Sequence, residues 1–274
     1  MPELPEVEAV RTRLEGFLSG KEIRDVDVRC ARLRIPVPTG LTQLLNGSHV
    51  SAVKRTGKYL LIHLNRGTWL VHLGMSGRFL FGVPTSAEEA KHDHLVLRTS
   101  CGSTIRYNDF RRFGTFAVCP PGEFISCPSL RRLGIDAMSH ELDGDVLFEL
   151  LRKRKAPIKV ALLDQGLISG LGNIYACESL YWSGIHPLRS ACSLIRSETH
   201  QLALAVRQVL LCAIEAGGST LRDYEGTSGA LGSFDRHFAV FQREGTACPR
   251  CHSPCVSKVS LRGRATYYCS TQQQ

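Results

Sequence analysis

The hydrophobic pattern of the chain changes its period once, and this change constrains the fold more than any other feature. Up to residue 118, short stretches of alternating apolar and β-branched residues are separated by Gly, Asn and Ser turns. A turn-rich segment follows at 119–128, with two adjacent prolines, and beyond it apolar residues recur at helical spacing. The sequence therefore predicts an α+β chain in which a β-sandwich or barrel precedes a helical part.

The expected strands lie at 26–28, 50–53, 59–64, 68–73, 79–81, 95–97, 104–107 and 113–118. The expected helices lie at 146–151, 158–163, 174–182 and 194–216. An apolar stripe over residues 7–18 predicts one further helix, which the β-rich part carries at its N-terminus.

The composition indicates a folded, basic protein. With 274 residues and 43% hydrophobic residues, the chain can form one large or two ordinary domains. A formal charge of +9, from 34 Lys and Arg against 25 Asp and Glu, favours a polyanionic partner such as nucleic acid, although a merely basic soluble protein has the same balance. We expect a cytoplasmic protein with no membrane partner, because the sequence has neither a bilayer-spanning apolar run nor a signal peptide.

The N-terminus carries a candidate nucleophile. Removal of Met1 leaves Pro2 with a secondary amine beside Glu3 and Glu6. An α-amino group titrates near pH ~8, against ~10.4 for lysine, so more of it is unprotonated at neutral pH. With a sugar aldehyde such an amine gives an iminium, which draws electrons during elimination while nearby carboxylates move protons. The same residues also suit ordinary helix punctuation, with Pro5 in the first turn, and on their own they leave both interpretations open.

The 11 cysteines divide into two groups. Most are scattered through a chain large enough to fold unaided, and we expect them to be reduced thiols that act as small hydrophobes. The exception is the C-terminal group Cys248, Cys251, Cys255 and Cys269.

A glycine-bearing turn at 167–175 joins two of the expected helices. The free backbone N–H groups and the positive end of the second helix suit a DNA phosphate, and the Asn173 amide lies beside them. This arrangement resembles a helix-turn-helix unit, but a tight αα-turn without a ligand has the same pattern.

A series of motifs then stands in one order along the chain. These are PELPEVE at 2–8, GKYL at 57–60, HLGMSG at 72–77, RRFG at 111–114, LDQ at 163–165, GLGNIY at 170–175, GGSTLRD at 217–223 and the cysteine group. Together they closely resemble the formamidopyrimidine-DNA glycosylases, bacterial base-excision enzymes for oxidised purines, essentially from end to end.

The resemblance implies a domain plan and a reaction. It implies an N-terminal catalytic β-sandwich domain at 1–118, a linker at 119–128, a helical helix-two-turns-helix DNA-binding domain at 129–240 and a zinc-finger-like hairpin at 241–274. Family members extrude 8-oxoguanine or a formamidopyrimidine from damaged double-stranded DNA, excise it, and cut the strand by β- and δ-elimination. We expect the protein to act as a monomer.

The resemblance also implies catalytic roles. Pro2 is the nucleophile at the anomeric carbon of the deoxyribose, Glu3 is the general acid/base at the sugar, and Glu6 supports the site. Lys58 holds a flanking phosphate and serves as the acid in β-elimination, and Arg264 grips phosphates and takes part in δ-elimination. Without the family context, Lys58 is an ordinary strand lysine and Arg264 a basic hairpin residue.

DNA contacts follow in the same way. His72 and Asn173 hold phosphates. Met75, Arg111 and Phe113 fill the gap that the extruded base leaves, and Arg111 contacts the orphaned base, preferably cytosine. Further DNA contacts fall on His92, Arg154, Lys155 and Lys159, although a basic run is usually a solvated helix face. The lesion-capping loop comprises Ser219, Thr220, Leu221, Arg222, Asp223 and Tyr224.

The sequence departs from the family at the zinc finger. The family pattern has two Cys-x-x-Cys pairs, but Gln272 stands where the last cysteine belongs. Cys255 or His252 can complete a distorted site, the metal can be held weakly with water, or the hairpin can lack zinc. Our hypothesis is one zinc ion on Cys248, Cys251 and Cys269, with Cys255 as the fourth ligand.

Two alternative functions stay open on the sequence. An endonuclease VIII-like glycosylase for oxidised pyrimidines shares the proline, the acid and the fold, whereas RRF at 111–113 and the long loop after Gly218 favour the purine enzyme. A non-catalytic DNA-binding homologue is the other alternative. The altered cysteine pattern favours it, and the intact Pro2, Glu3, Lys58 and Arg264 argue against it.

Overall fold

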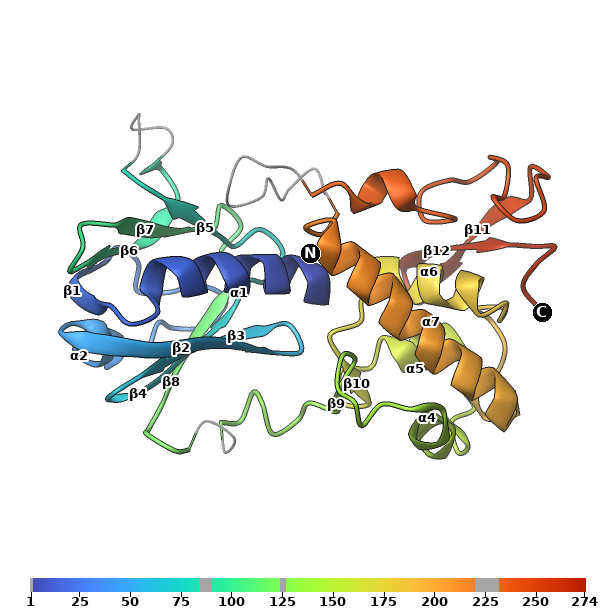
Figure 1. Cartoon of the computed structure of the whole chain (residues 1–274), viewed down its shortest axis with the longest axis horizontal. Helices are drawn as coiled ribbons and strands as arrows, with labels where there is room; N and C mark the ends of the chain where they lie inside the picture. The colour runs from blue at the N-terminus through green and yellow to red at the C-terminus, as the bar shows by residue number, and fades with distance from the viewer. Residues whose placement is uncertain (1, 84–89, 124–126, 220–231) are drawn as a thin grey trace. The chain divides into compact units, whose positions relative to one another are not determined.

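The chain divides into two compact units. The first comprises Met1–Arg131 with Gly217–Gly232, and the second comprises Arg132–Ala216 with Ser233–Gln274. The computed structural model describes residues 2–83, 90–123, 127–219 and 232–274 (Figure 1). None of the described helices is both long and apolar enough to cross a membrane.

The first unit is a β-sandwich that carries the N-terminal helix. Its elements are α1 (Leu4–Leu18), β1 (Glu22–Val28), α2 (Leu41–Leu45), β2 (Ser48–Thr56), β3 (Tyr59–Leu64), β4 (Gly67–His72), β5 (Arg78–Phe81), β6 (Asp93–Thr99), β7 (Thr104–Asn108) and β8 (Thr115–Cys119). The strand order is β5-β7-β6-β1-β2-β3-β4-β8 with antiparallel pairing throughout. β1 and β2 share only a short register, Glu22 to His49 and Ile23 to Ser48, and the sheet folds over there into two layers.

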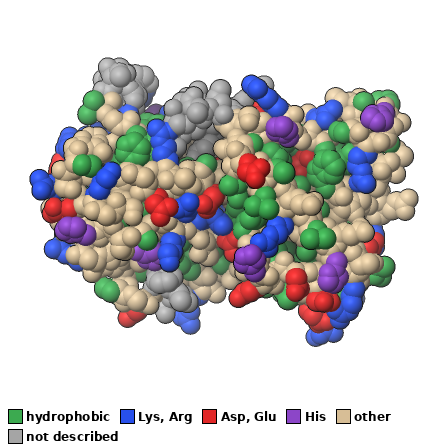
Figure 2. Space-filling model, viewed as in Figure 1, with side chains coloured by type: hydrophobic (Ala, Val, Ile, Leu, Met, Phe, Trp, Pro, Cys, Tyr) green, Lys and Arg blue, Asp and Glu red, His purple; other side chains and the backbone are tan. Residues whose placement is uncertain are grey.

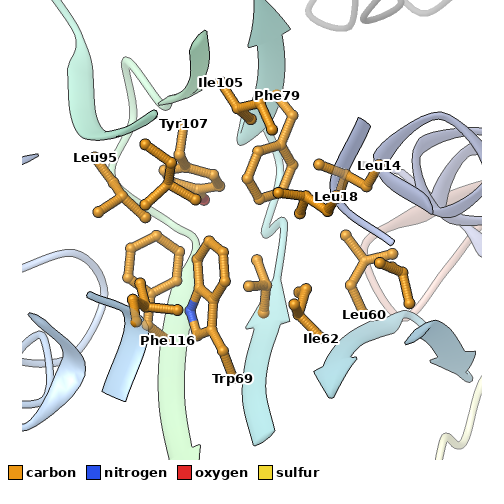
Figure 3. Close-up of a cluster of buried hydrophobic side chains, with 14 of the residues drawn as sticks. Leu14, Leu18, Leu60, Ile62, Trp69, Phe79, Leu95, Ile105, Tyr107 and Phe116 are labelled. Carbon is orange, nitrogen blue, oxygen red and sulfur yellow. The ribbon is translucent and has the colours of Figure 1, made fainter. Parts of the chain in front are cut away.

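The core of the sandwich lies between these layers. Leu14 and Leu18 of α1 point into it beside Leu60 and Ile62 of β3 (Figure 3). Trp69 is fully buried at its centre, edge-on to Phe79 at 6.0 Å and to Phe116 at 5.4 Å between ring centroids. Aromatic rings in this arrangement add about 0.5–1.5 kcal/mol per pair to the burial of their area. The apolar stripe predicted on the first helix is therefore the face that packs on the sandwich.

The second unit is helical and ends in a hairpin. Its elements are β9 (Ile135–Asp136), α4 (Gly144–Leu151), α5 (Ile158–Leu162), β10 (Ile168–Ser169), α6 (Asn173–Trp182), η2 (Ala191–Ser193), α7 (Arg196–Glu215), η3 (Phe234–His237), β11 (Val256–Leu261) and β12 (Arg264–Cys269). Leu204 and Leu211 of α7 are exposed, and Figure 2 shows hydrophobic side chains among the charged ones over this helix. The predicted α+β fold, a sandwich followed by helices and a terminal hairpin, is confirmed. The exact domain boundaries stay a prediction.

A buried glutamate fixes the chain that leads into the hairpin. The Glu178 side chain on α6 is fully buried, and its carboxylate accepts hydrogen bonds from the backbone N–H groups of Ala239, Val240 and Phe241 at 2.9, 3.0 and 2.8 Å. The Phe241 ring packs on Tyr267 of β12, 5.2 Å away between centroids. The segment before the hairpin is therefore held to α6 by its backbone and to β12 by its side chain.

We expect Glu178→Gln to lower the free energy of unfolding by about 1–3 kcal/mol, because the amide NH₂ replaces an acceptor and leaves a buried N–H without a partner. Chemical denaturation measures this change. Glu149→Gln on α4, whose side chain is half exposed, is the matched control and should change stability by less than ~1 kcal/mol. Equal losses in the two variants would contradict the role of Glu178.

Candidate active site and nucleic-acid interface

The N-terminal turn gathers the predicted nucleophile and both carboxylates. Pro2 is buried directly before α1, and Glu3 and Glu6 are 3% and 1% exposed. Glu6 Oε2 accepts a hydrogen bond from the Glu3 backbone N–H at 2.8 Å, which closes the first turn of α1. Glu6 Oε1 accepts from both the backbone N–H and the hydroxyl of Ser219, at 2.8 and 3.0 Å. The turn thus joins Pro2, Glu3 and Glu6 to the start of the predicted lesion loop.

Gly218 makes this contact possible. Its φ of +84° lies in the left-handed region, and a Cβ there would lie 2.9 Å from Glu6 Oε1. Of the predicted lesion loop, Ser219 is described, and Thr220, Leu221, Arg222, Asp223 and Tyr224 lie outside the described residues.

Lys58 and His72 lie side by side at the end of one strand pair. Lys58 is 6% exposed in the turn between β2 and β3, and the next residue, Tyr59, pairs with His72 at the end of β4. Burial, reinforced by the positive charges of Lys58 and Arg34, lowers the pKa of His72 to about 4. His72 Nδ1 accepts the Gly74 backbone N–H at 3.1 Å, so the proton of the neutral ring is on Nε2. A neutral imidazole of this tautomer can donate one hydrogen bond to a phosphate.

The predicted wedge residues occupy two adjoining loops. Met75 is half-buried, whereas Arg111 and Phe113 are exposed, with the Arg111 guanidinium 4.6 Å from the centre of the Phe113 ring. A Cβ on Gly74 would lie 2.4 Å from the Phe113 backbone, so the two loops touch directly. His92 is half-buried, with its ring 6.4 Å from that of Phe110.

The second unit holds the other predicted contacts. Arg154 and Lys155 are exposed, and Arg154 forms an ion pair with Asp164 at 3.2 Å. Asn173 begins α6, and its Nδ2 donates to Ala265 O at 2.9 Å. Arg264 is exposed at the first position of β12.

Lys159 requires a correction. It is fully buried, and its Nζ donates to Ala265 O at 3.1 Å and to Thr266 Oγ1 at 2.7 Å. A side chain without exposed surface cannot reach a DNA phosphate in this conformation, so the prediction of a direct contact is wrong. The charge instead holds the strand that begins at Arg264.

The four C-terminal cysteines form one cluster. The sulfur atoms of Cys248, Cys251, Cys255 and Cys269 all lie within 4.8 Å of one another. Tetrahedral zinc with Zn–S bonds of ~2.3 Å needs sulfurs roughly 3.8 Å apart, so this donor set fits a closed structural metal site. His252 is exposed and is not part of the cluster.

The tail beyond Cys269 is held without a cysteine at position 272. The backbone N–H of Cys269 donates to Gln273 Oε1 at 2.7 Å, and Gln273 Nε2 donates to Ile185 O at 2.8 Å. Sequence reasoning missed Gln273, and it also missed Ser76 and the buried Asp109, whose hydrogen bonds link the two wedge loops. The available signal was that Ser76 lies within HLGMSG and that Asp109 stands two positions before RRFG.

Comparison with known proteins gives a consistent result. The sequence profile of the formamidopyrimidine-DNA glycosylase N-terminal domain matches residues 1–116, and that of the H2TH domain of the same enzyme matches residues 133–225. The chain is 42% identical to the formamidopyrimidine-DNA glycosylase of Rhodospirillum rubrum and 44% identical to that of Gluconobacter oxydans, over 100% of each chain.

Solved structures agree. The fold is similar to that of the MutM (Fpg) protein of Thermus thermophilus, with a TM-score of 0.86 and 38% identity over 99% of this chain and 98% of the other. It is also similar to Lactococcus lactis Fpg in complex with DNA that contains an abasic site, with a TM-score of 0.89 and 33% identity over 100% of both chains.

The low pKa of His72 predicts a pH dependence of stability. The unfolded chain takes up the proton near pH ~6.5, whereas the folded protein does so at about 4. Because folding favours the neutral ring, the free energy of unfolding should fall as the pH drops from about 6.5 towards 4. In thermal melts at pH 7.5 and pH 5, His72→Asn, which keeps an acceptor for the Gly74 N–H, should lose less stability than the wild type. An equal loss in both proteins would show that His72 is not the group responsible.

Proposed function

We propose a function from one established premise: the chain belongs to the formamidopyrimidine-DNA glycosylase family. Its class of activity follows from that membership. It is a base-excision-repair DNA glycosylase and abasic-site lyase whose partner is damaged double-stranded DNA. We further propose that it works as a cytoplasmic monomer on the chromosome.

The observation that carries the mechanism is the buried N-terminal turn. Glu3 and Glu6 follow Pro2 in one buried turn, and hydrogen bonds from Glu3 and Ser219 hold the Glu6 carboxylate in place. The Pro2 nitrogen attacks the anomeric carbon of the deoxyribose, and the bond to the oxidised base breaks. Glu3 gives a proton to the ring oxygen as the sugar opens, which leaves an iminium between Pro2 and the sugar.

Strand cleavage follows from the same intermediate. The iminium acidifies the neighbouring sugar carbon, and loss of that proton expels the phosphate on the 3′ side of the lesion. A second elimination expels the phosphate on the 5′ side. Lys58 is assigned the phosphate contact and the proton transfer of the first elimination, and Arg264 those of the second. Lys58 keeps 6% of its surface exposed and Arg264 is exposed at the start of β12, which is compatible with these roles.

The lesion class is oxidised purines, 8-oxoguanine and formamidopyrimidines. One Lactococcus lactis Fpg structure holds Fapy-dG DNA, which supports this assignment. Another holds DNA with an oxidised pyrimidine, so oxidised pyrimidines are a second candidate class. Excision rates on a panel with one lesion of each class rank the two.

The cysteine cluster is assigned one zinc ion on Cys248, Cys251, Cys255 and Cys269. Four thiolates match the closed, tetrahedral sites that zinc occupies in structural hairpins. The ion would supply folding free energy to the hairpin and take no part in the chemistry.

Borohydride trapping tests the proposed chemistry. On duplex DNA with 8-oxoguanine opposite cytosine, the protein should form a covalent adduct that peptide mapping places at Pro2. Glu3→Gln should slow excision by roughly 10²–10⁴-fold, the usual size of a lost general acid. Glu8→Gln, on the same helix but paired with Arg11 and Arg55, should stay close to the wild type. Binding without an adduct would favour the non-catalytic homologue.

Metal analysis tests the ligand set. Protein purified without a chelator should contain about one zinc ion per chain, and Cys255→Ala should lose most of it, because a site needs all four ligands to stay closed. Gln272→Ala should retain the metal. A zinc content near zero in the wild type, or equal contents in the two variants, would contradict the assignment.

A further inference from the structure

Two surface loops of the first unit meet on one buried carboxylate. Asp109 is fully buried at the end of β7. Its Oδ1 accepts the Ser76 hydroxyl at 2.5 Å, and its Oδ2 accepts the Gly114 backbone N–H at 2.8 Å. Ser76 directly follows Met75, and Gly114 directly follows Phe113. One side chain therefore fixes both loops that carry the wedge.

The hydrogen bonds continue from Ser76 into the second loop. Ser76 Oγ, which donates to Asp109, accepts the backbone N–H of Arg111 at 3.3 Å. Asp109 is itself tied to β6 and the residue before it, because its backbone N–H donates to His92 O at 3.1 Å and its carbonyl accepts from His94 Nε2 at 2.9 Å. The carboxylate is thus anchored in the sheet, and the loops are anchored to the carboxylate.

Glycines allow the loops to approach this closely. Besides the contact of Gly74 with the Phe113 backbone, a Cβ on Gly77 would lie 2.3 Å from the Tyr107 hydroxyl, and one on Gly114 would lie 1.8 Å from it. The Tyr107 hydroxyl in turn lies 3.4 Å from Asp109 Oδ2. The space between the loops is filled by these polar groups, so neither loop can shift without breaking a buried hydrogen bond.

We propose that Asp109, acting through Ser76, is a positioning residue that holds Met75, Arg111 and Phe113 as one preformed wedge and thereby sets the preference for the base opposite the lesion. The proposal rests on the proposed function. A wedge that is ordered before binding avoids the entropy cost of ordering two loops on the DNA. Discrimination between bases by hydrogen bonds also depends on placing the donor accurately, here the guanidinium of Arg111.

If Asp109 only stabilises the fold, its loss should affect the activities differently from the loss of a positioning residue. If the hydrogen bonds only stabilise the fold, their loss lowers every activity in proportion to the folded fraction. If they position the wedge, the loss falls on steps that need the wedge. The ratio of excision opposite cytosine to excision opposite adenine therefore separates the two roles, whereas the total activity does not.

The test compares Ser76→Ala and Asp109→Asn with Ser48→Ala. Ser48 is an equally buried serine whose hydroxyl bonds to Leu44 O in the same unit, far from the wedge in sequence. Single-turnover rates are measured for excision of 8-oxoguanine opposite cytosine, for its excision opposite adenine, and for cleavage at a preformed abasic site. Thermal melts report the stability of each variant.

We expect Ser76→Ala and Asp109→Asn to lower excision opposite cytosine by roughly tenfold or more, the effect of one lost buried hydrogen bond in the transition state. The cytosine-to-adenine ratio should shrink, and cleavage at the abasic site should fall several times less. Ser48→Ala should keep the wild-type ratio.

Equal falls in all three rates, or an unchanged cytosine-to-adenine ratio, would overturn the proposal. If Asp109→Asn does not fold, Ser76→Ala carries the test, because it leaves the bond between Asp109 and Gly114 intact. A wild-type protein that cleaves no lesion substrate would instead overturn the proposed function. The wild-type measurement comes first for that reason.

Discussion

A carboxylate taken out of water must be given hydrogen-bond donors, and Glu6 obtains them from two distant parts of the chain. The backbone N–H of Glu3 comes from the N-terminal turn, and the N–H and hydroxyl of Ser219 come from beyond α7. Because losing a donor to a buried charge costs about 1–3 kcal/mol or more, the three groups are held in one arrangement. The position of Pro2, which precedes Glu3 in the same turn, depends on that arrangement.

Asp109 solves the same physical problem at a different place. Like Glu6, it is buried, and it draws a backbone N–H and a serine hydroxyl onto its two oxygens. Glu6 lies in the first turn of α1 and Asp109 directly follows β7, and each accepts hydrogen bonds from a segment that carries predicted DNA-facing residues. Low local polarity makes these bonds strong and their loss expensive, which is how a sandwich of ordinary apolar packing can hold irregular loops in place.

The sequence allowed prediction of those features that depend on local pattern. The period change located the sandwich and the helices, and the N-terminal motif placed Pro2, Glu3 and Glu6 within one turn. Burial at long range was not predictable, because a lysine such as Lys159 in a basic run has the composition of a solvated surface. The same holds for Asp109, whose distant partner Ser76 is brought to it by the pairing of β5 with β7. That Cys255, and not His252, lies among the other three cysteines depends on the three-dimensional path of the chain from Cys248 to Cys255.

The hairpin that carries Arg264 is secured from two sides. Lys159 and Asn173 both hydrogen-bond Ala265 O next to the arginine, and the cysteine cluster closes the far end of the same strand. An element with two independent attachments can tolerate change in one of them during evolution. Gln272 stands where the family pattern has a cysteine, the Cys255 thiol lies among the other three, and the contacts of Lys159 and Asn173 at the arginine's end of the strand are present all the same. A changed cysteine pattern in this hairpin is therefore a poor guide to loss of activity.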